Sequence, residues 1–296
     1  AKYPNGGRLF AGHIDLNDTL ENLSSLSSAA LATAENYYLT DATGNTGVVV
    51  STHEDLSVAK ADVHLGAVNK ADYLYTVKDN PSNLAAQDID TVAALASAQT
   101  VTVDESTAQG FASISQLTAM DGSTSATIVY TGVEDSSANL YSDSNGSGTY
   151  VKEGKNIVFE DTHSLTHLIS VNGATTGTIT LNTYSEQLSG SSTQITNALA
   201  GTFASTYTGN LVLSDTTLAV ATLNSINLLT TGEVNASSVS TLTGAASAMN
   251  TAYTANGTNQ MTGLGNESIT IDDTTLAASV LKTLDTNTEG TIDASS

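Results

Sequence analysis

Two histidines, His163 and His167, are spaced as a pair that could hold a transition metal. They stand four positions apart, directly after Glu160 and Asp161, and this spacing would put both imidazoles on one face of a helix. No third, distant ligand can be assigned, and His163 lies close to a predicted helix start. We therefore expect ordinary helix-start residues here, with a metal site as the alternative hypothesis.

A second cluster consists of His53, Glu54, Asp55 and His64. Thr52 precedes it and is a residue type that caps helices, because its hydroxyl can accept a hydrogen bond from a first-turn N–H group. We interpret the cluster as the start of a helix at about Glu54 rather than as a metal site.

The run Asp-Ser-Asn-Gly-Ser-Gly, from Asp143 to Gly148, resembles the front of a calcium-binding loop. In such loops alternate oxygen-bearing side chains and a glycine turn surround a hard cation, and Asp143 and Asn145 would supply the oxygens. The bidentate acidic residue expected beyond the loop is missing. A polar surface turn is the better interpretation, and calcium is the one cofactor that the sequence leaves open.

An acidic residue recurs along the second part of the chain, at Glu105, Asp161, Asp215 and Asp273. If coils stack, these carboxylates could form a ladder that binds cations or supplies general acids and bases. Helix capping explains the three aspartates with one cause, because Asp accepts hydrogen bonds from first-turn N–H groups. In the first copy Asp104 or Ser106 would have to cap instead.

Other catalytic signals are missing from the sequence. There is no Gly-x-Ser-x-Gly nucleophile elbow and no glycine-rich phosphate loop with a lysine. We therefore expect no enzyme and no catalytic residues.

The elements that position these residues form a repeat. Four short apolar runs each end at an acidic residue followed by Thr or Ser, and they begin at Val101, Ile157, Leu211 and Ile269, so the period is about 56 residues. Residues 215–238 and 273–296 align without a gap and are identical at 11 of 24 positions. This self-similarity predicts stacked supersecondary units.

One unit is predicted as a strand, a one-sided helix, a Gly turn and a second strand. The turns are Thr-Ser-Ala, Thr-Thr-Gly, Thr-Thr-Gly and Thr-Glu-Gly, beginning at Thr124, Thr175, Thr230 and Thr288, and we expect their Gly to adopt a positive φ. A second, weaker helix is expected at 200–207 and at 245–253. The fold class is therefore an α+β repeat, a β-rich solenoid-like stack with a separate N-terminal α+β segment.

The cycle of strand, Asp-Thr-Thr-Leu-Ala, helix, Thr-Thr-Gly and strand, with Gly263-Leu-Gly-Asn-Glu267 between copies, resembles repeats of very large bacterial surface or secreted proteins, both adhesin-like and surface-layer-like. The resemblance covers roughly 82–296 and implies an architecture rather than an activity. Such proteins often carry Gly-Gly-x-Gly-x-Asp calcium nonapeptides, and this sequence contains none.

Residues 1–80 differ in composition from the rest. They hold five of the eight basic residues and a net charge of −5, whereas 81–296, the repeat array, carries −17. We expect a boundary near Asn80 and Pro81, a helix over 18–38, strands at 48–50 and 73–77, and a docking or capping role for this segment.

The overall charge excludes several partners. The 296 residues contain 8 Lys and Arg against 30 Asp and Glu, a net charge of −22. Such a chain repels nucleic-acid phosphates and anionic headgroups, and no run of 18 apolar residues is present. We expect no nucleic-acid partner and no membrane insertion. The absence of Cys excludes disulfides and thiol nucleophiles.

These features favour a non-enzymatic structural protein, located outside the cell or on its surface, that forms or decorates a fibre, sheath or surface layer. Its expected partners are further copies of itself or other structural subunits. The alternatives are a virion structural protein, such as an appendage, fibre or decoration protein, and a polysaccharide-active β-solenoid enzyme. The start of the sequence lacks the apolar region of a signal peptide, and Ser296 aligns with Ser238 in the middle of a unit.

Overall fold

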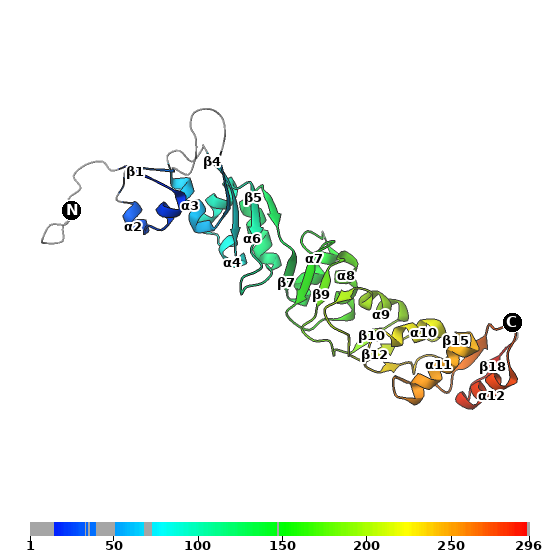
Figure 1. Ribbon diagram of the computed structural model, residues 1–296. Helices are drawn as coiled ribbons and strands as arrows, with labels where there is room; N and C mark the ends of the chain where they lie inside the picture. The colour runs from blue at the N-terminus through cyan, green and yellow to red at the C-terminus, as the bar shows by residue number, and fades with distance from the viewer. Residues whose placement is uncertain are drawn as a thin grey trace. The chain divides into compact units, whose positions relative to one another are not determined.

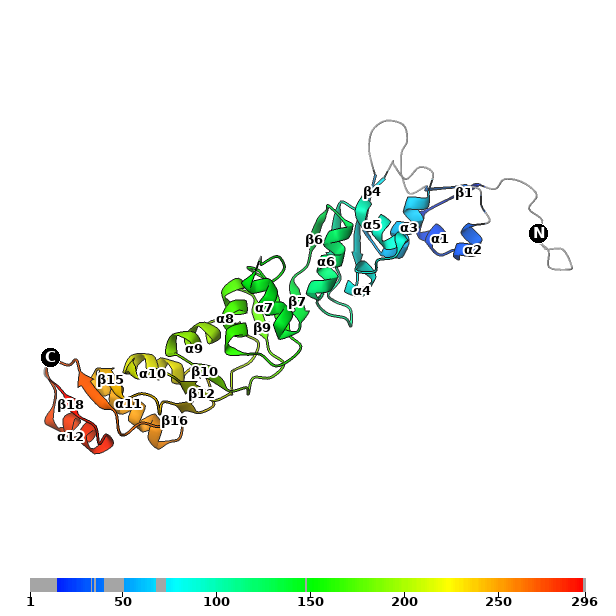
Figure 2. The same cartoon turned by 180° about the vertical axis from the view of Figure 1, so that it is seen from behind.

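The chain is mixed α/β, with helices that alternate with short parallel strands (Figure 1; Figure 2). The computed structural model describes residues 15–32, 34, 36–39, 51–67, 73–146 and 148–294. Within these residues there are 12 helices and five sheets, and all strand pairings are parallel. The chain divides into two compact units, 1–131 and 132–296.

The first unit contains two of the sheets. In one, β1 (Asp15–Asp18) pairs with β2 (Asn36–Leu39). The other has the order β3 (Ser51–Leu56), β4 (Tyr73–Asp79), β5 (Thr100–Val103), β6 (Thr127–Val129). The helices of this unit are α1 (Leu20–Ser24), α2 (Ser28–Leu31), α3 (Val58–Gly66), α4 (Pro81–Leu84), α5 (Ile89–Ser97) and α6 (Ile114–Ser123).

The second unit contains the other three sheets. Their orders are β7 (Gly132–Asp135), β8 (Asn156–Phe159), β9 (Thr178–Thr180), β11 (Thr202–Phe203); β10 (Leu188–Gly190), β12 (Leu211–Leu213), β14 (Val234–Asn235), β16 (Met261–Thr262); and β13 (Thr217–Ala219), β15 (Thr241–Gly244), β17 (Ser268–Ile271), β18 (Ile292–Asp293). The helices are α7 (Ser137–Asn145), α8 (Leu165–Ala174), α9 (Ser192–Leu199), α10 (Val220–Asn227), α11 (Ala246–Gly257) and α12 (Ala278–Asn287). Each helix from α8 to α12 contacts the helix before it.

The strands recur at about half of the sequence period. Val101 pairs with Ile128, 27 positions on, and Leu211 pairs with Val234, 23 positions on. One stretch of about 56 residues therefore spans two cycles of strand and helix, and we call each cycle a coil. The four predicted apolar strands are confirmed as β5, β8, β12 and β17.

The core of each coil is small and aliphatic. In β12, Leu211 and Leu213 are fully buried and Val212 between them is half-buried, as expected for a strand with one covered face. Helix α10 buries Val220, Leu223 and Ile226 and contacts β13 and β15. A coil this small cannot enclose its own apolar face, and α10 contacts the helices before and after it, α9 and α11.

The Thr-x-Gly turns join one coil to the one before it. The Thr230 hydroxyl donates to the carbonyl of Gly209, 2.8 Å away, and accepts from the N–H of Gly232. Thr288 makes the same contacts with Glu267 and Gly290. At Gly232 a Cβ would lie 2.6 Å from the carbonyl oxygen of Gly209. The glycine is needed because the neighbouring backbone is so close.

This finding corrects the expected reason for these glycines. Gly177, Gly232 and Gly290 are not among the glycines with positive φ. At each of them a Cβ would lie less than 3 Å from backbone of the preceding coil. The carbonyl oxygen that it would meet belongs to Lys155 for Gly177, to Gly209 for Gly232 and to Glu267 for Gly290. The constraint on these positions is therefore space rather than backbone conformation.

Aspartates that follow strands also join successive coils. The Asp215 carboxylate accepts hydrogen bonds from the Ser192 N–H at 2.6 Å and the Ser192 hydroxyl at 3.0 Å. Ser192 is the first residue of α9, one coil earlier. Three more pairs share this pattern, with the donor always the first N–H of a helix: Val58 to Asp79, Ser137 to Asp161, and Ala246 to Asp273.

The expectation that these aspartates cap their own helices is therefore wrong. The N-cap of α8 is Ser164, and those of α10 and α12 are Ala219 and Ala277. The predicted chemistry of these aspartates is correct, because each carboxylate accepts a hydrogen bond from the N–H of a helix start. The helix belongs to the preceding coil because parallel strands bring the end of one strand beside the start of the previous helix.

The N-terminal helix expected over 18–38 is also wrong. Helix α1 is capped by Thr19 and ends at Ser24, and the chain then forms α2 and β2. The Ser24 and Ser25 hydroxyls donate to the carbonyls of Leu20 and Asn22 at 2.7 and 2.6 Å. Such local bonds compete with a continued helix. The strand expected at 48–50 lies outside the described residues, and the strand expected at 73–77 is confirmed as β4.

The domain boundary also differs from expectation. The boundary expected at Asn80 and Pro81 lies inside the first unit, because β4 before it pairs with β5 after it in one sheet.

The helix expected at 245–253 is confirmed as α11, but the one at 200–207 is wrong. The Ser191 and Gln194 capping box starts α9 earlier, and that helix ends at Leu199.

Replacing Asp215 tests the contact between coils. We expect Asp215→Ala to lower the free energy of unfolding by about 2 kcal/mol, because the Ser192 N–H loses a charged acceptor. Asp215→Asn keeps an acceptor oxygen and is expected to lose less. The measurement is urea unfolding, with Asp272→Ala as control, because Asp272 is exposed and stands beside Asp273, the equivalent of Asp215. An equal loss in the control would contradict the assignment.

Replacing Gly232 tests the close approach of the two backbones. Gly232→Ala is expected to lower the free energy of unfolding by about 1–3 kcal/mol, because the added methyl overpacks the contact with Gly209. Gly173, in α8, has open space around its Cβ position, so Gly173→Ala is expected to raise stability by about 0.5–1 kcal/mol. Thermal or urea unfolding of both variants gives the comparison, and a neutral Gly232→Ala would rule out the packing argument.

Candidate functional site

The predicted histidine pair does not share a helix face. His163 precedes Ser164, the N-cap of α8, whereas His167 lies within the first turn of that helix. His163 is buried, at 7% exposure, between the rings of Phe159 and Tyr207, with both ring centroids 6.1 Å away. His167 stacks on Tyr141 at 5.1 Å. The two imidazoles thus take part in separate packing contacts, and metal binding by them stays a prediction.

The hydrogen bonds of His163 assign its proton. The Tyr207 hydroxyl donates to the carbonyl of Glu186 at 2.6 Å, so at its 3.3 Å contact with His163 Nε2 it must accept. Nε2 therefore carries the hydrogen, and buried Nδ1 is left without a partner. Protonating Nδ1 would place a charged, unpaired N–H in the core. Burial accordingly lowers the pKa of His163, an effect that Glu186 opposes.

The residues of the predicted calcium loop lie mostly in a helix. Asp143 and Asn145 belong to the last turn of α7, so the expectation that they open a loop is wrong. One carboxylate oxygen of Asp143, Oδ2, accepts from the N–H groups of Tyr150 and Val151 at 3.0 and 2.7 Å. This side chain fixes the segment after α7. Calcium binding by Asp143 and Asn145 stays a prediction.

The cluster around His53 differs from expectation in its secondary structure. Residues 51–56 form β3, and α3 starts only after Ser57, whose hydroxyl accepts from the Lys60 N–H. The helix start expected at Glu54 is therefore wrong, because this segment pairs with β4 instead. His64, in α3, is buried with its ring 4.8 Å from that of Tyr75.

The recurring carboxylates do not meet at one place. Asp161, Asp215 and Asp273 each accept the first N–H of a different helix. Glu105 instead accepts from the N–H of Thr131 at 2.6 Å, and Asp104 accepts from Ser106. The helix that follows Asp104 is capped by Ser113. Their shared role is to bind backbone and hydroxyl groups.

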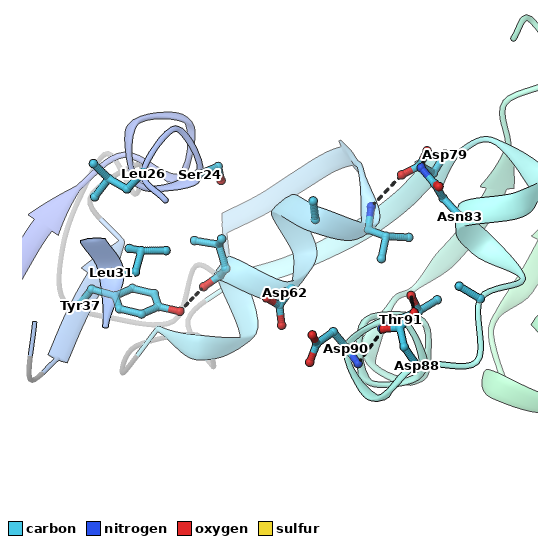
Figure 3. A pocket seen from close by; sticks show the side chains of 14 residues that line it. Ser24, Leu26, Leu31, Tyr37, Asp62, Asp79, Asn83, Asp88, Asp90 and Thr91 are labelled. Carbon is cyan, nitrogen blue, oxygen red and sulfur yellow. Dashed lines mark hydrogen bonds between the residues drawn. The ribbon is translucent and has the colours of Figure 1, made fainter. Parts of the chain in front are cut away.

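A groove in the first unit gathers four aspartates, which are Asp62, Asp79, Asp88 and Asp90. It has a volume of about 600 Å³ and is lined by residues of α1 to α5, β2 and β4. Asp62 from α3 and Asp90 from α5 lie close together in it, as Figure 3 shows. Leu26 and Leu31 add an apolar wall at the other end. Among the described residues, no lysine or arginine lines this groove.

The carboxylates of the groove fall into two kinds. Asp88 caps α5 by accepting from the N–H groups of Asp90 and Thr91, and these bonds lower its pKa. Asp79 accepts from the Val58 N–H. No described group donates a hydrogen bond to the Asp62 carboxylate. Burial raises its pKa first, and the charges of Asp90 and Asp88 raise it further. Asp62 and Asp90 are therefore the groups with capacity to attract a cation or a basic side chain.

Sequence reasoning missed this groove. Its acidic residues come from α3 and α5, more than 20 positions apart, and no repeat or motif links them. Only the packing of α3 beside α5 brings Asp62 to Asp90. The described residues contain no group of three or more His, Asp or Glu side chains arranged to hold a metal. Nor do they include a helix with the length and apolar character needed to cross a bilayer.

The buried His163 predicts a pH dependence of stability. Because its pKa is lowered in the folded state, the unfolded chain binds the proton first, near pH 6.5. The stability that neutral His163 contributes is present above pH 6.5 and is lost as pH falls through the folded-state value. We expect His163→Phe to flatten this decline in urea unfolding between pH 7 and about 5.5. His167→Gln, the control, should keep the decline, and an unchanged slope in His163→Phe would contradict the assignment.

Comparison of the chain with protein-family models, with curated proteins and with solved structures finds no match. What the chain does is therefore inferred from its own residues and their contacts.

Proposed function

We propose that this protein is a non-enzymatic structural component whose coils stack into a solenoid-like array that forms or decorates a fibre, sheath or surface layer. The observation that carries the proposal is the repeated joint between coils. Buried Thr hydroxyls and strand-end aspartates bind the backbone of the preceding coil at intervals along the chain. A joint of this kind can be repeated without limit, which suits an extended structure.

The use of polar residues supports this proposal over a catalytic one. Asp161 and Asp215 are two of the four recurring carboxylates that a catalytic alternative would use, and both accept hydrogen bonds from helix starts at 2.6 Å. A general acid or base needs a carboxyl group that is open to substrate. His163 is enclosed by Phe159 and Tyr207 and serves the core.

Self-association, or binding to other structural subunits, is the proposed mode of action. Within the described residues each of the five sheets has two edge strands, whose backbone groups can pair with another strand. The net charge of −22 keeps such edges from non-specific contact by mutual repulsion. The surface is rich in hydroxyl and amide groups and poor in charged pairs, and the repeats resemble those of bacterial surface proteins, so we propose a location outside the cell or on its surface.

Sedimentation velocity and electron microscopy of the purified chain test the proposal, with and without millimolar calcium. We expect concentration-dependent assembly into filaments or sheets, because coil joints extend from one copy to the next. A monodisperse monomer in both conditions would count against it. Cleavage of acidic polysaccharides that is abolished by Asp161→Ala or Asp215→Ala would replace it with the enzymatic alternative.

A further inference from the structure

Neighbouring coils of the second unit meet through two kinds of interface, and the two kinds alternate along the chain. In the first kind, here called the aspartate interface, a carboxylate accepts a hydrogen bond from the first N–H of the preceding helix. It joins the coils of α7 and α8, of α9 and α10, and of α11 and α12, through Asp161, Asp215 and Asp273. In the second kind, the threonine interface, a Thr-x-Gly turn binds a backbone carbonyl of the preceding coil. It joins the coils of α8 and α9, of α10 and α11, and of α12 and β18, through Thr175, Thr230 and Thr288.

The first residues of the helices alternate in the same order. At the aspartate interfaces these residues are small and buried, namely Ser137, Ser192 and Ala246. At the two threonine interfaces where a described strand end faces a helix start, they are Leu165 and Val220. In the described part of the second unit, each of the three aspartates therefore faces a side chain no larger than that of serine.

Glycine faces the two large helix starts. Extending the register of β13 and β15 by one residue places Gly244 opposite Val220. A Cβ at Gly244 would lie 3.0 Å from Cγ1 of Val220, and a Cβ at Gly190 would lie 2.5 Å from Cδ2 of Leu165. The space that a carboxylate occupies at one kind of interface is therefore occupied by the helix-start side chain at the other kind.

Each kind of interface excludes the residues of the other. An aspartate opposite Leu or Val would have its carboxylate held against an apolar side chain, which removes water without replacing its hydrogen bonds. A glycine opposite Ser or Ala would leave the first helix N–H without its acceptor, and a gap where the carboxylate stood. Protein surfaces discriminate between partners by such penalties as well as by attractive contacts.

We propose that the residue opposite each helix start determines which coil can pack there, so that aspartate accepts a small helix start and glycine accepts Leu or Val. A shift of the stack by one coil brings an aspartate to a large helix start, whereas a shift by two coils restores every pair. The array can therefore gain or lose coils only in pairs. This accounts for a sequence period of about 56 residues when the strands recur at about half that distance. The selectivity acts within one chain and does not rest on the proposed assembly.

A double-mutant cycle at one aspartate interface tests the proposal. Asp215→Gly and Ser192→Val are each expected to lower the folding equilibrium constant at least about tenfold, because the first removes the acceptor and the second sets an isopropyl group against the carboxylate. Together they rebuild the pair seen at Gly244 and Val220. The double variant is therefore expected to be at least about tenfold more stable than the product of the two single effects predicts. Urea unfolding of the full chain gives all the values.

The matched control combines Ser192→Val with Asp273→Gly, because the same two substitutions then lie at different aspartate interfaces. Their effects on the folding equilibrium constant are expected to multiply without coupling, since the two sites share no partner. Coupling in the control as large as that between Asp215→Gly and Ser192→Val, or no coupling in either combination, would overturn the proposal.

Two deletions within the full chain give a second test. Removing residues 161–214 takes out a pair of coils and brings Asp215 opposite Ser137, a small helix start. Removing residues 190–214 takes out one coil and brings Asp215 opposite Leu165. We expect the longer deletion to keep a cooperative urea transition, although it removes more residues, and the shorter deletion to lose that transition or to unfold at a lower urea concentration. Two deletion proteins of equal stability would contradict the exchange of coils in pairs.

Discussion

The described coils depend on one constraint, which is that backbone groups left over at one coil must find partners in the next. A helix start has N–H groups with no partner inside the helix, and a buried carbonyl is costly without a donor. Asp215 supplies the acceptor for the start of α9, and Thr230 supplies the donor for the carbonyl of Gly209. Both residues belong to the following coil. At these joints the following coil therefore completes the hydrogen bonding of the coil before it.

Local patterns predicted the elements well and their connections poorly. The alternation of Leu211 and Leu213 was sufficient to predict β12, and the helices after Asp215 and Asp273 were found. The role of the aspartates was assigned to the wrong helix, because a sequence shows which residue can cap but not which helix start lies nearest in space. The same limit applies to Gly232, whose close neighbour is Gly209 in the previous coil, and to Asp62 and Asp90, which only tertiary packing brings into one groove.

The way the chain uses its polar residues relates the fold to the proposed function. Asp161 binds the first N–H of α7, and His163 fills the core. The joints bind backbone groups, which every coil has. The residues between one joint and the next can therefore vary. This explains how residues 215–238 and 273–296 can be identical at only 11 of 24 positions and still each form a helix followed by a strand. A surface built from such joints is suited to accept another coil.

Amide hydrogen exchange of the native protein, followed by NMR, tests the central claim most directly. The first N–H of a helix normally has no protein acceptor and exchanges quickly. The N–H groups of Ser137, Ser192 and Ala246 donate to Asp161, Asp215 and Asp273 of the following coil. If the aspartates join the coils, these three amides exchange as slowly as the interiors of their helices. Exchange as fast as that of an exposed amide, in an otherwise protected helix, would contradict the account.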